Sequence, residues 1–157
     1  MIRHATAIDE TIALRDPMRM LTAHDREQAR QLGQHLRERM GPALHVWTSP
    51  LVRAVQTAEL VLAGLGSVAV TVDVLPSLAP GESVRAAVAA IRALADPACV
   101  LLVGHEPGLS GIAAGIAAVL AGHHDLPALA NAEALAITGG TATWRIAWDH
   151  QPSARSP

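Results

Sequence analysis

Short apolar runs alternate with longer stretches of helical periodicity along this chain of 157 residues. The runs over 45–48, 68–74 and 98–103 have the length of strands, and the last is a continuous apolar run of the kind that buried parallel strands show. Such alternation predicts βαβ units. We therefore expect an α/β fold, a three-layer α/β/α sandwich around a mostly parallel central sheet.

Helices are expected over 24–40, 50–63, 82–94 and 107–120, and two further strands over 133–138 and 141–148. Ser49 is a natural N-cap and Pro50 a natural first residue for the second helix. Gly139-Gly140 is expected to join the last two strands. We expect one domain over 1–149 and a frayed, flexible tail over 150–157.

The first expected strand is short. A strand that precedes Arg3-His4 should hold about five residues, yet only Met1 and Ile2 lie upstream. Either this strand is unusually short or Met1 is not the natural start. We favour the second explanation, because so brief a central strand would leave backbone groups of its neighbours unpaired.

Composition excludes several classes of function. All 12 basic residues are arginine and the net charge is -2, which gives no electrostatic footprint for nucleic acid. No apolar segment is long enough to span a bilayer, and no signal sequence opens the chain, so we expect a cytoplasmic protein without a membrane partner. The single cysteine, Cys99, lies in an apolar run and is expected to be a packing residue rather than a nucleophile.

Polar residues follow three of the expected strands. Arg3-His4 comes first, Ser49 begins a second fragment that includes Arg53, and His105 ends the strand over 98–103. Parallel strands deliver their carboxyl ends to one edge of the sheet, where ligand crevices form. Two histidines and two arginines would then converge, a set that suits phosphoryl transfer to a histidine.

His4 is the candidate nucleophile, because a neutral imidazole can attack phosphorus and form a phosphohistidine intermediate. Arg53 lies in the first turn of a helix, so its side chain would lean back toward the crevice, and the helix start from Ser49 would help to bind an anion. Arg3 would bind phosphate oxygens, and a protonated His105 would stabilise their charge. The alternatives are a surface histidine at position 4, a solvated arginine at position 3 and a helix-capping histidine at position 105.

The order of these fragments resembles the histidine phosphatase superfamily, also called phosphoglycerate mutase-like, and especially its SixA-type phosphohistidine phosphatases. The resemblance covers most of the chain. Its points of match are Arg3-His4, the segment 19–22, Ser49-Pro50 with Arg53-Ala54 and Gln56-Thr57, and the segment 103–110. It implies phosphate-binding roles for Arg3, Arg53 and His105, and a place near the site for Arg19, which otherwise reads as a loop residue in solvent.

The sequence departs from many members of that family at the general acid. Relatives that act on phosphate esters carry a carboxylic acid after the third strand, where this chain has Pro80. Glu82 is the nearby candidate, although a glutamate there also suits the first turn of a helix. A phosphorylated imidazole needs less acid assistance than an alkyl ester, so phosphohistidine on a protein is the preferred substrate.

Two alternatives stay open at this point. One is a small-molecule phosphomonoesterase with the same nucleophile and Glu82 or Glu106 as acid, and the other is a non-catalytic phosphate-binding module. We expect no metal and no other cofactor, because the sequence has no nucleotide-binding motif. The cluster His123-His124-Asp125 also lacks the context of a metal site.

Overall fold

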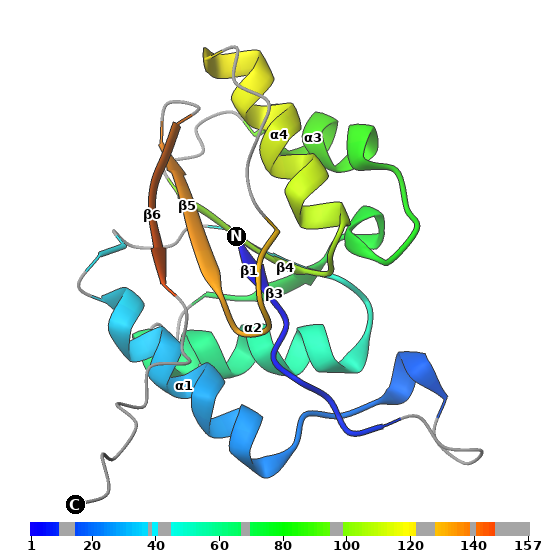
Figure 1. Ribbon diagram of the computed structural model, residues 1–157, viewed down its shortest axis with the longest axis vertical. Helices are drawn as coiled ribbons and strands as arrows, with labels where there is room; N and C mark the ends of the chain where they lie inside the picture. Colours follow the sequence, from blue (N-terminus) through cyan, green and yellow to red (C-terminus); the bar gives the residue numbers. More distant parts are fainter. Residues whose placement is uncertain are drawn as a thin grey trace, which may run out of the picture.

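The computed structural model describes residues 1–9, 15–37, 39–40, 45–66, 70–94, 99–121, 128–138 and 141–146 (Figure 1). Its sheet has the strand order β3-β2-β4-β1-β5-β6. The strands are β1 (Ile2–Arg3), β2 (His45–Thr48), β3 (Val72–Val74), β4 (Val100–Gly104), β5 (Ala134–Thr138) and β6 (Thr141–Ile146). The first four run parallel to one another, and β5 and β6 are antiparallel additions. The expected α/β fold with a mostly parallel sheet is confirmed.

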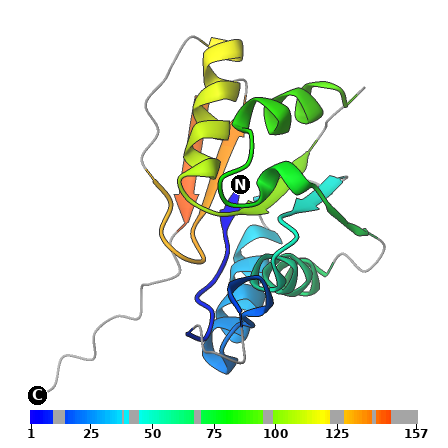
Figure 2. The same cartoon turned by 90° about the vertical axis from the view of Figure 1, so that its right-hand side faces the viewer.

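In the described part of the chain, four α-helices lie on the two faces of this sheet (Figures 1 and 2). They are α1 (Ala23–Arg37), α2 (Val52–Leu65), α3 (Val84–Arg92) and α4 (Gly108–Ala121), with short 3-10 turns η1 (Asp16–Met18) and η2 (Pro76–Leu78). The core on the α1 and α2 side contains Leu101 and Val103, and the core on the other side contains Leu102. Alternate residues of β4 therefore serve opposite faces, as expected of a strand buried on both sides.

Two predicted helix starts are each wrong by two residues, because α2 begins at Val52 and α3 at Val84. Helix α2 begins at Val52 with Leu51 as its cap, so Ser49 is not the N-cap and Pro50 is not the first helical residue. The Ser49 hydroxyl instead accepts a hydrogen bond from the Leu51 amide at 3.3 Å. Helix α3 begins at Val84, because the Ser83 hydroxyl caps it by accepting from the Ala86 amide.

Strand β1 has only two residues, yet it is paired on both sides. Ile2 and Arg3 pair with Val103 and Gly104 of β4, and Ile2 also pairs with Ala134 of β5. The flanking backbone adds hydrogen bonds from the Arg3 amide to Glu133 O at 3.1 Å and from the Leu135 amide to Met1 O at 2.8 Å. The loss of pairing that we expected for a strand this short does not occur at these positions.

Several predicted features lie outside the described residues: the Gly139-Gly140 turn, the tail over 150–157 and the His123-His124-Asp125 cluster. Among the residues that the structure describes, no helix is long and apolar enough to cross a membrane.

Helices α1 and α2 approach each other closely at two glycines, Gly33 of α1 and Gly64 of α2. A Cβ atom on Gly33 would lie 2.1 Å from Val61 O, and one on Gly64 would lie 2.0 Å from Arg30 O. Both contacts are with backbone, which cannot turn away as a side chain can. Because neither glycine carries a side chain, α1 and α2, the helix that carries Arg53, pack backbone against backbone at this crossing.

We expect Gly33→Ala to lower the free energy of unfolding by about 1–3 kcal/mol, because the added methyl group must push the two helices apart. Urea denaturation measures the change. Gly108→Ala is the matched control, since a Cβ there has no heavy atom within 4 Å. Equal stability of the two variants would contradict the close packing of α1 on α2.

Candidate active site

The carboxyl ends of three neighbouring strands, β2, β4 and β1, bring the predicted residues together. His4 follows β1, His105 follows β4 and Ser49 follows β2. The strand pairing continues past the strand ends, since the His4 amide donates to Gly104 O at 3.1 Å and the Ser49 amide donates to Val103 O at 3.0 Å. The imidazole rings of His4 and His105 lie 4.6 Å apart between centroids. The predicted convergence at this edge is present in the structure.

His4 is held as a neutral imidazole with its lone pair on Nε2. Its Nδ1 lies 2.6 Å from the Ala5 carbonyl oxygen, which can only accept, so Nδ1 carries the proton. Arg53 Nε donates to His4 Nε2 at 3.3 Å. Burial lowers the pKa of His4 to about 4, opposed by the Ala5 hydrogen bond and assisted by the charges of Arg53, Arg3 and Arg19. At neutral pH, Nε2 can therefore act as a nucleophile.

His105 is more deeply buried, at 5% exposure, and its Nε2 is hydrogen-bonded to Ser49 Oγ at 2.9 Å. Burial lowers its pKa to about 3, with further contributions from His4, Arg53 and Arg3. His105 is thus neutral at pH 7 in this arrangement. Because a nearby anion favours the charged imidazole, a bound phosphoryl group would raise that pKa.

Arg53 lies in the first turn of α2, as predicted, and its side chain is only 7% exposed. While Nε faces His4, both terminal nitrogens contact Asp16. The backbone carbonyl of Arg53 accepts a hydrogen bond from the buried Thr57 hydroxyl at 2.7 Å, and that hydroxyl accepts one from the Ala5 amide. Thr57 therefore ties α2 to the segment that carries His4.

Arg3 reaches the site from β1. Its Nη1 donates to Leu129 O at 2.8 Å, and its buried Nε has no hydrogen-bond partner among the described residues. The Glu106 carboxylate accepts from the Leu129 amide at 2.7 Å and from the Ser110 amide at 3.2 Å. Glu106 thus fixes the loop that holds Arg3. A buried guanidinium N–H without a partner is suited to an anionic ligand.

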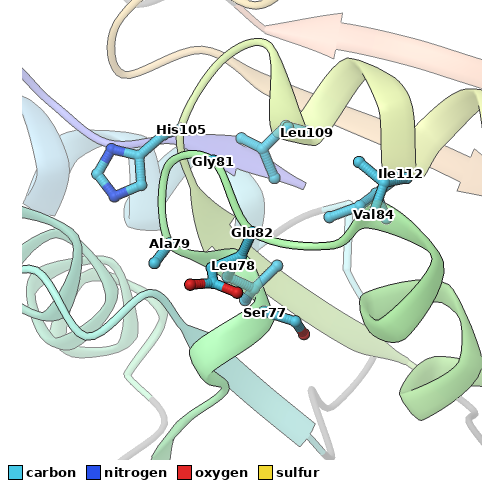
Figure 3. Close-up of a pocket in the computed structure, with 10 residues that line it drawn as sticks. Ser77, Leu78, Ala79, Gly81, Glu82, Val84, His105, Leu109 and Ile112 are labelled. Carbon is cyan, nitrogen blue, oxygen red and sulfur yellow. The ribbon is translucent and has the colours of Figure 1, made fainter.

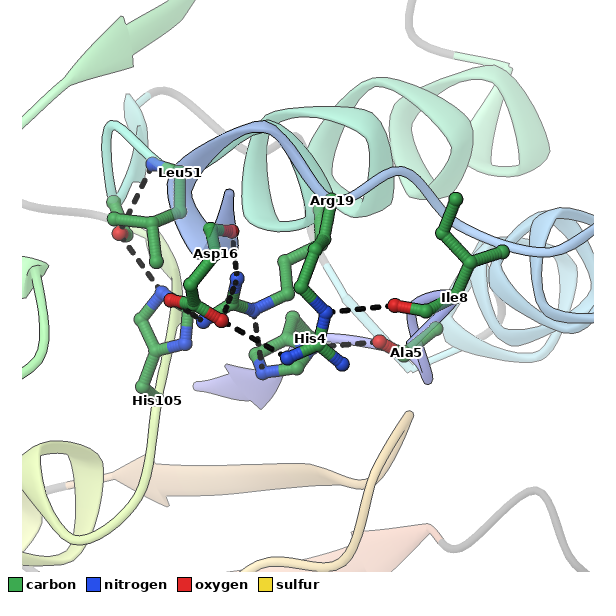
Figure 4. A network of polar contacts seen from close by, with 9 residues as sticks. His4, Ala5, Ile8, Asp16, Arg19, Leu51 and His105 are labelled. Carbon is green, nitrogen blue, oxygen red and sulfur yellow. Dashed lines mark hydrogen bonds and ion pairs between the residues drawn. The ribbon is translucent and has the colours of Figure 1, made fainter. Parts of the chain in front are cut away.

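Arg19 is not a freely solvated loop residue. Its Nε donates to Ile8 O at 2.7 Å, and its Nη1 is 2.9 Å from Asp16 Oδ1. Although burial alone raises the pKa of Asp16, hydrogen bonds from Arg19 and Arg53 hold it below its ordinary value. Asp16 is therefore a carboxylate that joins two arginines next to the histidine pair (Figure 4).

Glu82 lines a pocket together with His105, Ser77 and Ala79 (Figure 3). It is exposed and precedes Ser83, the N-cap of α3, so the first turn of that helix does not contain it. The interpretation of Glu82 as a first-turn charge is wrong, and the candidate acid faces the same pocket as His105.

Sequence reasoning missed three contributors to this site: Asp16, the Leu129 carbonyl and the role of Glu106 as a loop anchor. Asp16 and Leu129 had no periodic or strand-end signal, and Glu106, which follows the end of β4, was considered only as an acid.

Among the described residues, no group of three His, Cys, Asp or Glu side chains is arranged to hold a metal ion. Burial raises the pKa of the Cys99 thiol, which precedes the opposite end of β4.

Residues 1–79 match the family model of the histidine phosphatase superfamily (branch 1). An uncharacterized protein of Picosynechococcus sp. is 37% identical over 128 residues, covering 78% of this chain and 74% of the relative.

Solved structures share the fold. A tungstate complex of the protein histidine phosphatase SixA matches with a TM-score of 0.77 and 25% identity, covering 94% of each chain. A mycobacterial glucosyl-3-phosphoglycerate phosphatase matches with a TM-score of 0.54 and 20% identity, covering 73% of this chain and 76% of that chain. The second match shows the fold alone.

The pKa values of His4 and His105 predict an acid-sensitive fold. Free histidine has a pKa of about 6.5, so between that pH and about 4 the unfolded chain binds protons that the folded site does not. We expect the free energy of unfolding to fall over this range by about 1 kcal/mol per pH unit for each histidine. Urea denaturation at pH 7 and pH 5 measures it.

In His4→Asn the loss of stability on acidification should be smaller. His24→Asn, which removes an exposed imidazole from α1, is the matched control. The same pH dependence in His4→Asn as in the parent protein would contradict a buried neutral His4.

Proposed function

Since this chain belongs to the histidine phosphatase superfamily and is a histidine-nucleophile phosphatase, we propose that it removes the phosphoryl group from phosphohistidine displayed on another protein. The family match and the SixA-type structural relatives support the phosphatase activity. The observation that carries the proposal is the state of His4, with Nδ1–H on the Ala5 carbonyl and an Nε2 lone pair beside Arg53 and His105.

In the first step, His4 Nε2 attacks phosphorus as the bond from phosphorus to the substrate imidazole nitrogen breaks. The second ring nitrogen of the substrate already carries a proton, so the departing ring takes only the bonding electron pair and leaves as neutral imidazole. The proton that stays on His4 Nδ1 is held by the Ala5 carbonyl, which stabilises the positive charge that develops on the ring. The result is a phosphohistidine at position 4.

In the second step, water attacks this phosphorus, inorganic phosphate leaves and His4 Nε2 regains its lone pair. Arg3 and Arg53 would bind the phosphoryl oxygens in both steps, because guanidinium N–H groups match phosphate geometry. Ser49 would orient His105, which becomes protonated beside the phosphoryl group and stabilises its oxygens. Arg19, which contacts Asp16, would contribute positive charge without binding the phosphoryl oxygens itself.

The preference for phosphohistidine rests on the leaving group. An alkoxide requires protonation as it departs, whereas imidazole leaves without full negative charge. Against the effect of burial, hydrogen bonds from Arg19 and Arg53 lower the pKa of Asp16, which keeps it a carboxylate. The Glu106 carboxylate is occupied by two backbone amides. The overall similarity to SixA, over 94% of both chains, favours the same substrate class.

A second candidate function is phosphomonoester hydrolysis, which the position of Glu82 favours. Glu82 and His105 line the same pocket, so an ester bound there would have a carboxyl group available as an acid (Figure 3). Under this alternative Glu82→Gln would reduce ester hydrolysis by about 10²- to 10⁴-fold, the usual contribution of a general acid.

We expect kcat/KM to be much larger for a phosphohistidine-bearing protein than for glycerol 2-phosphate, an alkyl ester whose leaving alkoxide must be protonated. His4→Ala should lose turnover of both, because both need the nucleophile. Release of inorganic phosphate measures the rates. His24→Ala is the matched control, since it removes an exposed imidazole outside the site.

Under the leading proposal Glu82→Gln leaves phosphohistidine hydrolysis unchanged. A preference for the ester that depends on Glu82 would support the second candidate instead. If neither substrate shows turnover that depends on His4, the proposed function is wrong.

A further inference from the structure

We propose that Asp16 is a positioning residue, which holds one edge of the Arg53 guanidinium so that the other edge faces the reacting nitrogen of His4. This inference rests on the proposed function, because it gives Arg53 a phosphoryl group to bind. Asp16 lies on η1, away from the strand ends and helix faces from which the other site residues were predicted.

Asp16 makes three contacts with the end of the Arg53 side chain. Arg53 Nη1 donates to the Asp16 backbone carbonyl at 2.9 Å and to Oδ1 at 3.2 Å, and Nη2 donates to Oδ2 at 3.2 Å. The guanidinium is planar, so fixing both terminal nitrogens also fixes the direction of the Nε–H bond. That bond points at His4 Nε2, 3.3 Å away.

The two edges of Arg53 therefore have separate partners. Asp16 occupies the edge formed by Nη1 and Nη2, whereas Nε–H and the remaining Nη2–H form the edge directed at His4. When phosphorus is bonded to His4 Nε2, its oxygens lie next to this second edge, which can bind them as a fork. Asp16 and the phosphoryl group need not compete for the same N–H groups.

Asp16 is itself held in place. Arg19 Nη1 contacts Oδ1 at 2.9 Å, and Arg19 Nε is anchored on the Ile8 carbonyl at 2.7 Å. The Arg53 side chain is 7% exposed, so its charge requires a close counter-ion, and Asp16 supplies one. Arg19, Asp16 and Arg53 form a connected row that ends at the nucleophile His4.

The test is Asp16→Asn, which keeps the shape of the side chain but turns an amide NH₂ toward an N–H of Arg53. We expect kcat on the phosphohistidine-bearing protein to fall by about 100-fold, the usual cost of a misplaced group at a reacting centre. KM should change less than kcat, and inorganic phosphate should bind more weakly in calorimetry. Asp73→Asn, an exposed aspartate on β3, is the matched control.

A double-mutant cycle shows whether Asp16 acts through Arg53. We expect Asp16→Asn to have no further effect on kcat or on phosphate affinity once Arg53 is changed to Ala. Effects that multiply in the double variant would overturn the inference, as would an Asp16→Asn variant that behaves like Asp73→Asn. Tighter phosphate binding with undiminished kcat would also overturn it, since Asp16 would then be a competitor for Arg53.

The two proposals fail in different ways. A protein without turnover that depends on His4 contradicts the proposed function, and the phosphate affinities of the same variants still decide whether Asp16 orients Arg53. Normal turnover in the parent protein together with normal turnover and phosphate affinity in Asp16→Asn contradicts the role of Asp16 alone.

Discussion

The adjacent placement of β2, β4 and β1 is the constraint on which the rest of this site depends. Hydrogen bonds from the His4 amide to Gly104 O and from the Ser49 amide to Val103 O extend the parallel sheet past the strand ends. They place His4, His105 and Ser49 side by side, although the sequence separates them widely. Because a two-residue β1 is paired with both β4 and β5, His4 leaves the sheet at a fixed point.

The site combines two neutral imidazoles, a buried His105 and a partly buried His4, with several fixed positive charges. Burial and the neighbouring arginines hold the pKa of His4 near 4 and that of His105 near 3, which leaves both imidazoles uncharged at neutral pH. An anionic phosphoryl group reverses this balance, since it neutralises the arginines and favours a protonated His105. The same charges that keep the nucleophile deprotonated therefore attract its substrate.

Much of this arrangement could be predicted because it follows from periodicity. Strand ends located His4 and His105, and the first turn of α2 located Arg53. Local capping was harder to predict: Ser49 was the expected cap of α2 but does not cap it, and the cap of α3, Ser83, was not foreseen. Asp16 gave no signal at all, because its role depends on side-chain contacts with Arg19 and Arg53 that no sequence period encodes.

The most direct test of this account is to trap the phosphoenzyme. The protein is mixed with a phosphohistidine-bearing substrate, quenched in alkali to protect acid-labile phosphohistidine, digested and mapped by mass spectrometry. The account predicts a single phosphorylated site at His4, absent from His4→Ala. Phosphate on His105, or steady turnover without any phosphorylated enzyme in the burst phase, would contradict His4 as the nucleophile.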